Sequence, residues 1–157
     1  PADAGYYNDL GVALSQKGDW SGALAAIREA IRLSPNHAGY HANLAEAQGQ
    51  TGDWIGAEAE AQAAIKLDPK SPWVHTMLGF ARGGRGDTPG ALASLEEALR
   101  LDADKIDTHF YQGWVLARVG RKTEAVMAYR RVLELTKTQP ENWYVRTATA
   151  ALQELER

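Results

Sequence analysis

Hydrophobic and small residues recur along this chain with the spacing of amphipathic helices that come in pairs. The first stripe follows the i, i+3, i+4, i+7 spacing of one buried helical face and consists of Tyr7, Leu10, Gly11 and Leu14. A second stripe consists of Leu24, Ile27 and Ile31. Between the two stripes, Gly18 suits a left-handed helix end, and Asp19 can accept hydrogen bonds from the free amides of the next helix. The pattern predicts a helical hairpin with helices over 3–17 and 20–33, the second ended by Ser34-Pro35.

This hairpin recurs with a period of 34 residues. Glycine keeps the period at the expected turns, which are Gly18, Gly52, Gly86 and Gly120. Alanine keeps it in the second helices, at Ala23, Ala57, Ala91 and Ala125. We therefore expect four units, at about 4–37, 38–71, 72–105 and 106–139, in a single domain spanning 1–157. A ninth helix is expected at about 140–156, where it would cover the open end of the array.

An aromatic residue or His, then Leu-Gly, Ala and Pro, appear in this order in the first unit, and this order resembles the tetratricopeptide-repeat (TPR) pattern. Later units depart from it in places: the fourth has Gln112 where Leu is expected, and Asp102-Ala103 replaces the Pro-containing end of the third. The resemblance implies an all-α fold: a right-handed α-α superhelix of four helical hairpins plus a C-terminal capping helix. In that family a variable stripe on each first helix lines a concave groove that holds extended or helical peptides. We therefore expect a scaffold for protein–protein interaction and no enzymatic activity.

Composition narrows the classes of partner. The chain has 17 Lys and Arg against 20 Asp and Glu, a net charge of -3, and no basic run, so we expect no binding of nucleic acid. No apolar run approaches the roughly 20 residues of a membrane helix, so we expect a soluble chain without membrane insertion. There is no Cys, and both a cytoplasmic and an exported location fit. Because the chain begins with Pro1, we expect a processed chain or a piece of a longer protein.

The variable stripe supplies the candidate partner-binding residues. They are Asn8, Asn43, Glu46, Trp73, Met77, Phe80, Phe110, Tyr111, Trp114 and Tyr144. The first half of the stripe is small and polar and the second half is aromatic, so we expect an apolar peptide or helix as ligand, with Asn8, Asn43 and Glu46 setting its register. Glycines, among them Gly49 and Gly84, are expected to leave room on the groove wall. In the alternative, the last helix leans into the groove and buries the rings as an additional core.

The stripe differs from the family's known site for chaperone C-terminal tails, so we do not expect such a tail as the ligand. Members that bind chaperone C-terminal tails use Lys, Asn and Arg at five places of the stripe. This chain has at those places Asn8, Val12, Asn43, Trp73 and Met77. Only Asn43 fits, so a two-carboxylate tail would lack its cationic partners on the stripe.

Metal and catalytic sites are not expected. His41, His75 and His109 recur at the period, but equivalent residues on stacked hairpins lie on the order of a helix diameter apart, too far to share one metal ion. We expect them to be interior, hydrogen-bonded side chains. The glycine-rich run over 83–86 lacks the Gly-Lys-Ser/Thr ending of a phosphate loop. We predict no cofactor, no metal and no catalytic residue.

Two alternatives to hetero-binding stay open at this point. The chain could be a structural module that self-assembles, with the aromatic groove or the last helix packed on another copy as a homo-oligomer. It could also be the targeting or regulatory domain of a larger enzyme.

Overall fold

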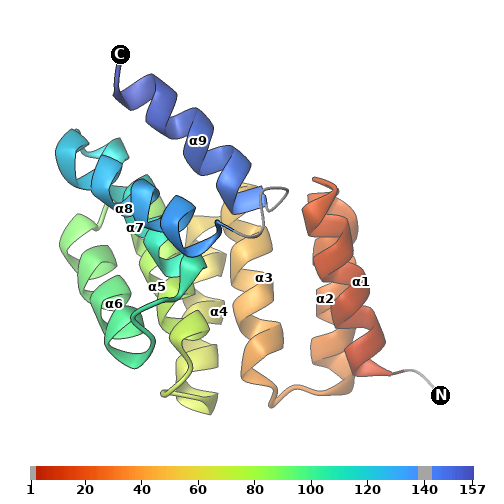
Figure 1. Ribbon diagram of the computed structural model, residues 1–157. Helices are drawn as coiled ribbons and strands as arrows, with labels where there is room; N and C mark the ends of the chain where they lie inside the picture. The colour runs from red at the N-terminus through yellow and green to blue at the C-terminus, as the bar shows by residue number, and fades with distance from the viewer. Residues whose placement is uncertain (1–2, 138–142) are drawn as a thin grey trace.

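The computed structural model describes residues 3–137 and 143–157, and these residues form helices that lie in antiparallel pairs (Figure 1). The first helices of the pairs are α1 (Ala4–Gln16), α3 (Ala38–Gln50), α5 (Pro72–Arg85) and α7 (Ile106–Arg118). The second helices are α2 (Trp20–Leu33), α4 (Trp54–Leu67), α6 (Thr88–Leu101) and α8 (Lys122–Leu135). The last helix is α9 (Trp143–Leu155). The predicted all-α repeat fold is confirmed; the predicted start of the last helix at Pro140 lies outside the described residues.

The hairpin turns have the chemistry that the sequence predicts. Positive φ angles of +79°, +87°, +88° and +76° are found at Gly18, Gly52, Gly86 and Gly120. In the first three turns the next residue is Asp, whose carboxylate accepts a backbone N–H three residues on, at 2.9–3.0 Å. The fourth turn has Arg121 at this place, and its side chain makes no capping hydrogen bond. The fourth hairpin is therefore the one whose second helix begins without a side-chain cap.

Residue size is matched where the two helices of a hairpin cross. A Cβ atom at Gly11 would lie 2.5 Å from Ile27 Cγ1, and one at Gly79 would lie 2.6 Å from Leu95 Cγ. The second unit has the small Ala61 where the other units have the larger side chains, and it carries Ala45 in place of the glycine. Close approach of the two backbones thus explains the recurrent small residue.

The histidines that recur at the period fasten the loops between units. The Nε2 atoms of His41, His75 and His109 lie 2.8–2.9 Å from the carbonyl oxygens of Pro35, Pro69 and Ala103, each six residues earlier. Each ring N–H donates to a carbonyl of the loop that precedes its helix. The predicted hydrogen bonds of these residues are confirmed, but the side chains are half-buried and not interior.

Packing between units is uneven along the array. One core cluster runs through α3 to α9 and includes buried side chains from each of these helices. The first hairpin reaches this body through a separate, smaller cluster whose buried members are Ile27, Leu44 and Ala47. In Figure 1, α1 and α2 stand beside α3 at one end, and α9 runs along the top of the view from above α3 to the C-terminus at the upper left.

Candidate functional site

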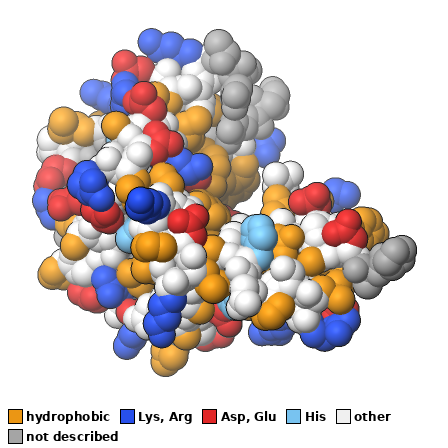
Figure 2. Space-filling view, turned by 90° about the horizontal axis from the view of Figure 1, so that it is seen from below, with side chains coloured by type: hydrophobic (Ala, Val, Ile, Leu, Met, Phe, Trp, Pro, Cys, Tyr) orange, Lys and Arg blue, Asp and Glu red, His pale blue; other side chains and the backbone are white. Residues whose placement is uncertain are grey.

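A cleft separates the first hairpin from the rest of the molecule. Its volume is about 690 Å³, and Figure 2 shows the hollow between the smaller part at the right and the main body. One wall comes from α1 and α2 and consists of Val12, Ser15, Gln16, Lys17, Trp20 and Ile27. The other comes from α3, α5 and α9 and consists of Asn43, Glu46, Gln50, Trp73, Trp143, Tyr144 and Arg146. We call this space the cleft below.

Four of the ten predicted partner-binding residues line the cleft: Asn43, Glu46, Trp73 and Tyr144. They come from three helices that are far apart in the sequence, and the stacking of the hairpins brings them together. Asn8 joins this group indirectly, because Asn43 Nδ2 donates a hydrogen bond to Asn8 Oδ1 at 2.8 Å. Trp114 does not line the cleft; it lies half-buried with the Arg118 guanidinium 4.8 Å from its ring centre.

The other four predicted residues, Met77, Phe80, Phe110 and Tyr111, are core side chains. Each side chain is almost completely shielded from solvent; Tyr111, for instance, is 1% exposed. The expectation that packing leaves these side chains free is therefore corrected. We do not carry them forward as contacts, because a partner cannot reach them in this conformation.

Helix α9 contributes to the burial of Phe110. The Phe110 ring lies 5.1 Å from the Trp143 ring and 5.2 Å from the Tyr144 ring, measured between centroids. Phe110 also packs edge-on against Tyr129 of α8 at 5.8 Å. The alternative, in which the last helix buries the aromatic rings, is therefore correct for Phe110. The cleft beside Trp73 and Tyr144 is open.

Trp54, at the start of α4, packs against Phe80 and Trp114 and was missed from the sequence. Its ring lies 5.2 Å from the Phe80 ring and 5.8 Å from the Trp114 ring. A Cβ atom at Gly84 would overlap the Trp54 ring, and one at Gly49 would overlap Phe80. The glycines on the groove wall therefore accommodate the chain's own rings and leave no room for a ligand there. The signal in the sequence was a bulky Trp that faces glycines about one unit away.

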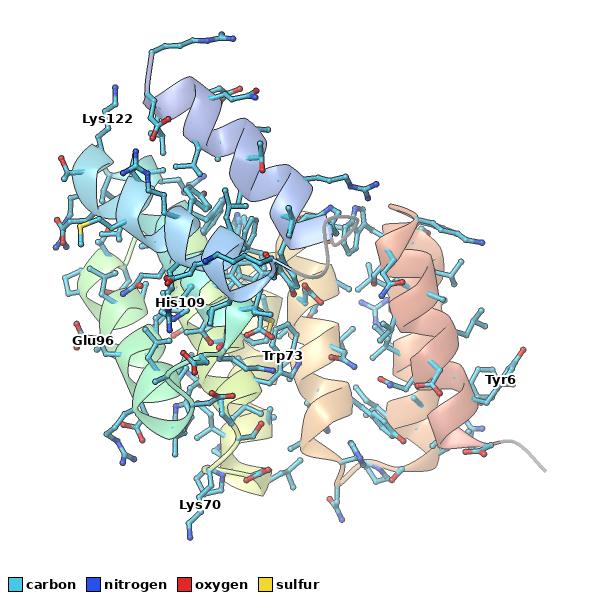
Figure 3. The ribbon with its side chains drawn as sticks, viewed as in Figure 1. Tyr6, Lys70, Trp73, Glu96, His109 and Lys122 are labelled. Atoms are coloured by element: carbon cyan, nitrogen blue, oxygen red, sulfur yellow. The ribbon has the colours of Figure 1, made fainter. Side chains whose placement is uncertain are left out.

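A polar ladder crosses the floor of the cleft. Trp73 Nε1 donates to Asn43 Oδ1 at 3.0 Å, and Asn43 in turn donates to Asn8. Figure 3 shows Trp73 between α5 and α3, where this bond forms. The ladder joins α1, α3 and α5 through side chains, so it links the first hairpin to the body without filling the cleft.

Glu46 places in the cleft a carboxyl group whose pKa is raised. Burial raises its pKa to about 7, against the hydrogen bond that it accepts from Tyr111 Oη at 2.7 Å. The carboxylate of Asp107 raises the pKa of Glu46 further. Burial also raises the pKa of Asp107, although its ion pair with Lys105 at 3.3 Å opposes the shift. Glu46 thus keeps its proton to a higher pH than an exposed glutamate does.

The cleft also contains charged, aromatic and amide side chains that the sequence did not single out. They are Lys17, Trp20, Gln50, Trp143 and Arg146. Lys17 and Trp20 belong to the first turn and the helix that follows it, and Arg146 belongs to the last helix, so these three do not lie on the stripe of a first helix, whereas Gln50 ends α3. Only the position of the first hairpin relative to α9 brings them to one space.

The described residues do not suggest a metal site. No group of three or more His, Asp or Glu in residues 3–137 and 143–157 is placed to hold a metal ion. None of the helices in that part of the chain combines the length and hydropathy needed to cross a membrane.

Comparison with known proteins adds evidence about the fold. A sequence profile of the tetratricopeptide repeat matches the chain twice, over residues 8–72 and 76–140. A search of curated proteins finds no match.

Among solved structures, TTC0263, a thermophilic TPR protein of Thermus thermophilus, has 24% identity and a TM-score of 0.80, over 97% of this chain and 80% of that chain. MamA from Desulfovibrio magneticus RS-1 has 22% identity and a TM-score of 0.64, over 87% and 77%. The Sgt2 TPR domain from Aspergillus fumigatus has 20% identity and a TM-score of 0.67, over 76% and 81%. At these identities the similarity concerns the fold.

Proposed function

This chain belongs to the tetratricopeptide-repeat family, and we propose that it binds a peptide or helix of a partner protein in the cleft. Proteins built from this repeat serve in general as scaffolds for protein–protein interaction and are generally not enzymes. The cleft carries the proposal: it has a volume of about 690 Å³ and combines aromatic walls with a few polar groups. Concave sites with this mixture are typical of ligand recognition.

The aromatic side chains on both walls are the expected anchors. Trp20 belongs to the first hairpin, whereas Trp73, Trp143 and Tyr144 belong to the opposite wall. A large apolar side chain of a partner gains roughly 1.5–3 kcal/mol when it is fully buried, so two such contacts suit a binding site of micromolar strength after association costs. Asn43 and Glu46 provide the polar groups that fix the position of the ligand.

Site-specific photo-crosslinking tests this proposal. A photoreactive amino acid replaces Ser15, which lines the cleft on α1, and in a second variant it replaces Glu96, an exposed residue of α6. Figure 3 shows Glu96 at the opposite edge of the molecule from α1. We expect a partner to be crosslinked from position 15 and not from position 96. Equal products from both positions, or products from position 96 alone, would contradict binding in the cleft.

Self-assembly is a second candidate, because the outer face of α1 lacks the covering that its copies have. Tyr6 is 63% exposed and Leu10 is 37% exposed. Their equivalents one and two units later include Leu44, Leu78 and Val74, which are buried where each first helix packs on the preceding second helix. Figure 3 shows Tyr6 on the side of α1 that faces away from the other hairpins. A second copy could cover this face.

Sedimentation velocity over a range of protein concentrations decides this candidate. Self-association through α1 should disappear in a Tyr6→Asp variant. A matched Ile55→Asp variant should leave it unchanged, because Ile55 is 74% exposed on α4 and lies outside that face. A wild-type chain that sediments as a monomer at every concentration would eliminate the candidate.

A further inference from the structure

Two cations in the cleft have no carboxylate partner among the described residues. Lys17 follows the end of α1 and Arg146 lies on α9, and both line the cleft from opposite walls. Both side chains belong to exposed residues, and neither forms an ion pair with any residue in 3–137 or 143–157. By contrast, Arg82 and Arg85 on the body share the carboxylate of Glu58. The chain as a whole carries a net charge of -3, so the two cations in the cleft are opposite in sign to the chain's net charge.

The negative charge available to these cations within the cleft is small. Glu46 supplies the single acidic side chain among the described residues that line it. The Tyr111 hydroxyl already occupies one oxygen of this carboxyl group at 2.7 Å, and burial raises its pKa to about 7. Among the described residues that line the cleft, two are cations and one is a carboxyl group whose charged form burial disfavours.

The cations flank the aromatic part of the cleft. Arg146 lies three residues after Trp143 on α9, and Lys17 lies three residues before Trp20 across the first turn. Trp73 adds a third indole, whose N–H is already donated to Asn43. The remaining recognition chemistry is thus a pair of positive charges next to flat apolar surfaces. A carboxylate accepts two parallel hydrogen bonds from the Arg guanidinium, and a large apolar side chain packs on the indole rings.

We propose that the partner segment is an acidic peptide, whose carboxylate lies between Lys17 and Arg146 while a neighbouring aromatic or Leu side chain packs on the tryptophans of the cleft. This inference rests on the proposed function, because it names the partner of the same site. Both cations lie outside the first-helix stripe, where the sequence lacks the Lys and Arg of chaperone-tail binders. Opposite charge across the interface would set the choice of partner and the rate of association.

Selection from a library of random linear displayed peptides tests the inference directly. The library is selected on the wild-type protein, on a Lys17→Glu/Arg146→Glu double variant, and on a Lys70→Glu/Lys122→Glu control. The control makes the same change in net charge at two surface lysines that do not line the cleft, and Figure 3 labels both far from it. Circular dichroism verifies that each variant is folded.

We expect the wild-type protein and the control to enrich peptides with Asp or Glu close to an aromatic residue or Leu. The double variant should lose the acidic residues from its enriched peptides and take up Lys or Arg in their place. For one enriched acidic peptide, fluorescence anisotropy should show an affinity at least about tenfold weaker for the double variant. Added salt should weaken the wild-type complex more than that of the double variant.

The outcomes separate this inference from the proposed function. Enriched peptides that are neutral or basic, or acidic peptides that bind the double variant as well as the wild type, would overturn the inference. If those peptides still lose binding in a Trp143→Ala variant, binding in the cleft stands and only the charge class is wrong. If no peptide is enriched and Ser15 yields no crosslink, both proposals fail.

Discussion

The first hairpin and the body formed by α3 to α9 are built from the same repeat but are held very differently. The body shares one continuous core that extends from Ala42 to Leu152. The first hairpin is attached by Ile27, Leu44 and Ala47, with the Asn8–Asn43 hydrogen bond beside them. The cleft lies at the boundary between the two parts.

This difference shows how a repeat protein can combine a stable wall with an adjustable one. Ring contacts such as Phe80–Tyr111, with centroids 4.5 Å apart, make the body wall well packed. The opposite wall belongs to a hairpin with few buried neighbours, and segments of this kind open locally at a lower free energy. We therefore expect the width of the cleft to depend on the first hairpin, and the following predictions test this comparison.

The largest effect is expected from a cavity in the body. Phe80→Ala removes a ring that is 2% exposed and contacts Trp54, Tyr111 and Trp114. We expect the free energy of unfolding to fall by about 3–5 kcal/mol in urea titrations followed by tryptophan fluorescence. A Met127→Ala control, at a residue that is 67% exposed, should change it by less than about 0.5 kcal/mol. A similar loss in both variants would contradict the packed body.

A smaller and more local effect is expected from the attachment of the first hairpin. Ile27→Ala removes a side chain that is 1% exposed from the small cluster, at a cost of about 2–4 kcal/mol to the packing of α1 and α2. Hydrogen exchange followed by mass spectrometry should show faster exchange in α1 and α2 and unchanged protection in α5 to α7. Equal acceleration in both regions would mean that the two parts unfold as one unit, and the comparison would be wrong.

A pH-dependent effect is expected from Glu46. Its ordinary pKa of 4.5 rises to about 7 in the folded protein, so the folded state holds the proton more tightly than the unfolded state. Stability should therefore fall as the pH rises from about 4.5 to about 7 and then level off. The groups that face this carboxyl group are Asp107, Tyr111 and Tyr144.

Glu46→Gln removes this titration and tests it. The difference in unfolding free energy between pH 5 and pH 8 should be smaller in the variant by about 1–3 kcal/mol. Asp107, whose pKa is also raised, supplies a slope of the same sign that remains in both proteins. Identical pH profiles for the two proteins would show that Glu46 is solvated and not part of the body wall.

The smallest effect is expected from the missing helix cap of the fourth hairpin. Arg121→Asp would place at this turn the residue that caps α2, α4 and α6. We expect a gain of about 0.5–1 kcal/mol, partly offset by loss of the exposed Arg121–Glu124 ion pair. Thermal unfolding should show a higher midpoint for the variant. Asp19→Ala is the reverse change in the first hairpin. It should lower the hydrogen-exchange protection of α2 and leave the midpoint of thermal unfolding at its wild-type value.

Much of the candidate site could not be predicted from the sequence, for reasons that particular residues make clear. Phe110 and Trp73 occupy the same kind of position on their helices, yet Phe110 is covered by α9 and Trp73 borders the cleft. The periodicity indicates which side of a helix a residue occupies but not what lies opposite it. Trp54 reaches across to Gly84, a contact between residues 30 positions apart in the sequence.

The sequence by itself determined the helices, their turns and their stacking order, because these depend on local chemistry repeated every 34 residues: glycine with positive φ, aspartate caps, and small residues where helices cross. Only the tertiary structure decided which rings are core and which border the cleft. It also decided that Lys17 and Arg146, 129 positions apart in the printed sequence, face one space. The physical reason is that burial and charge proximity depend on how distant helices pack, and that information is not contained in any one repeat.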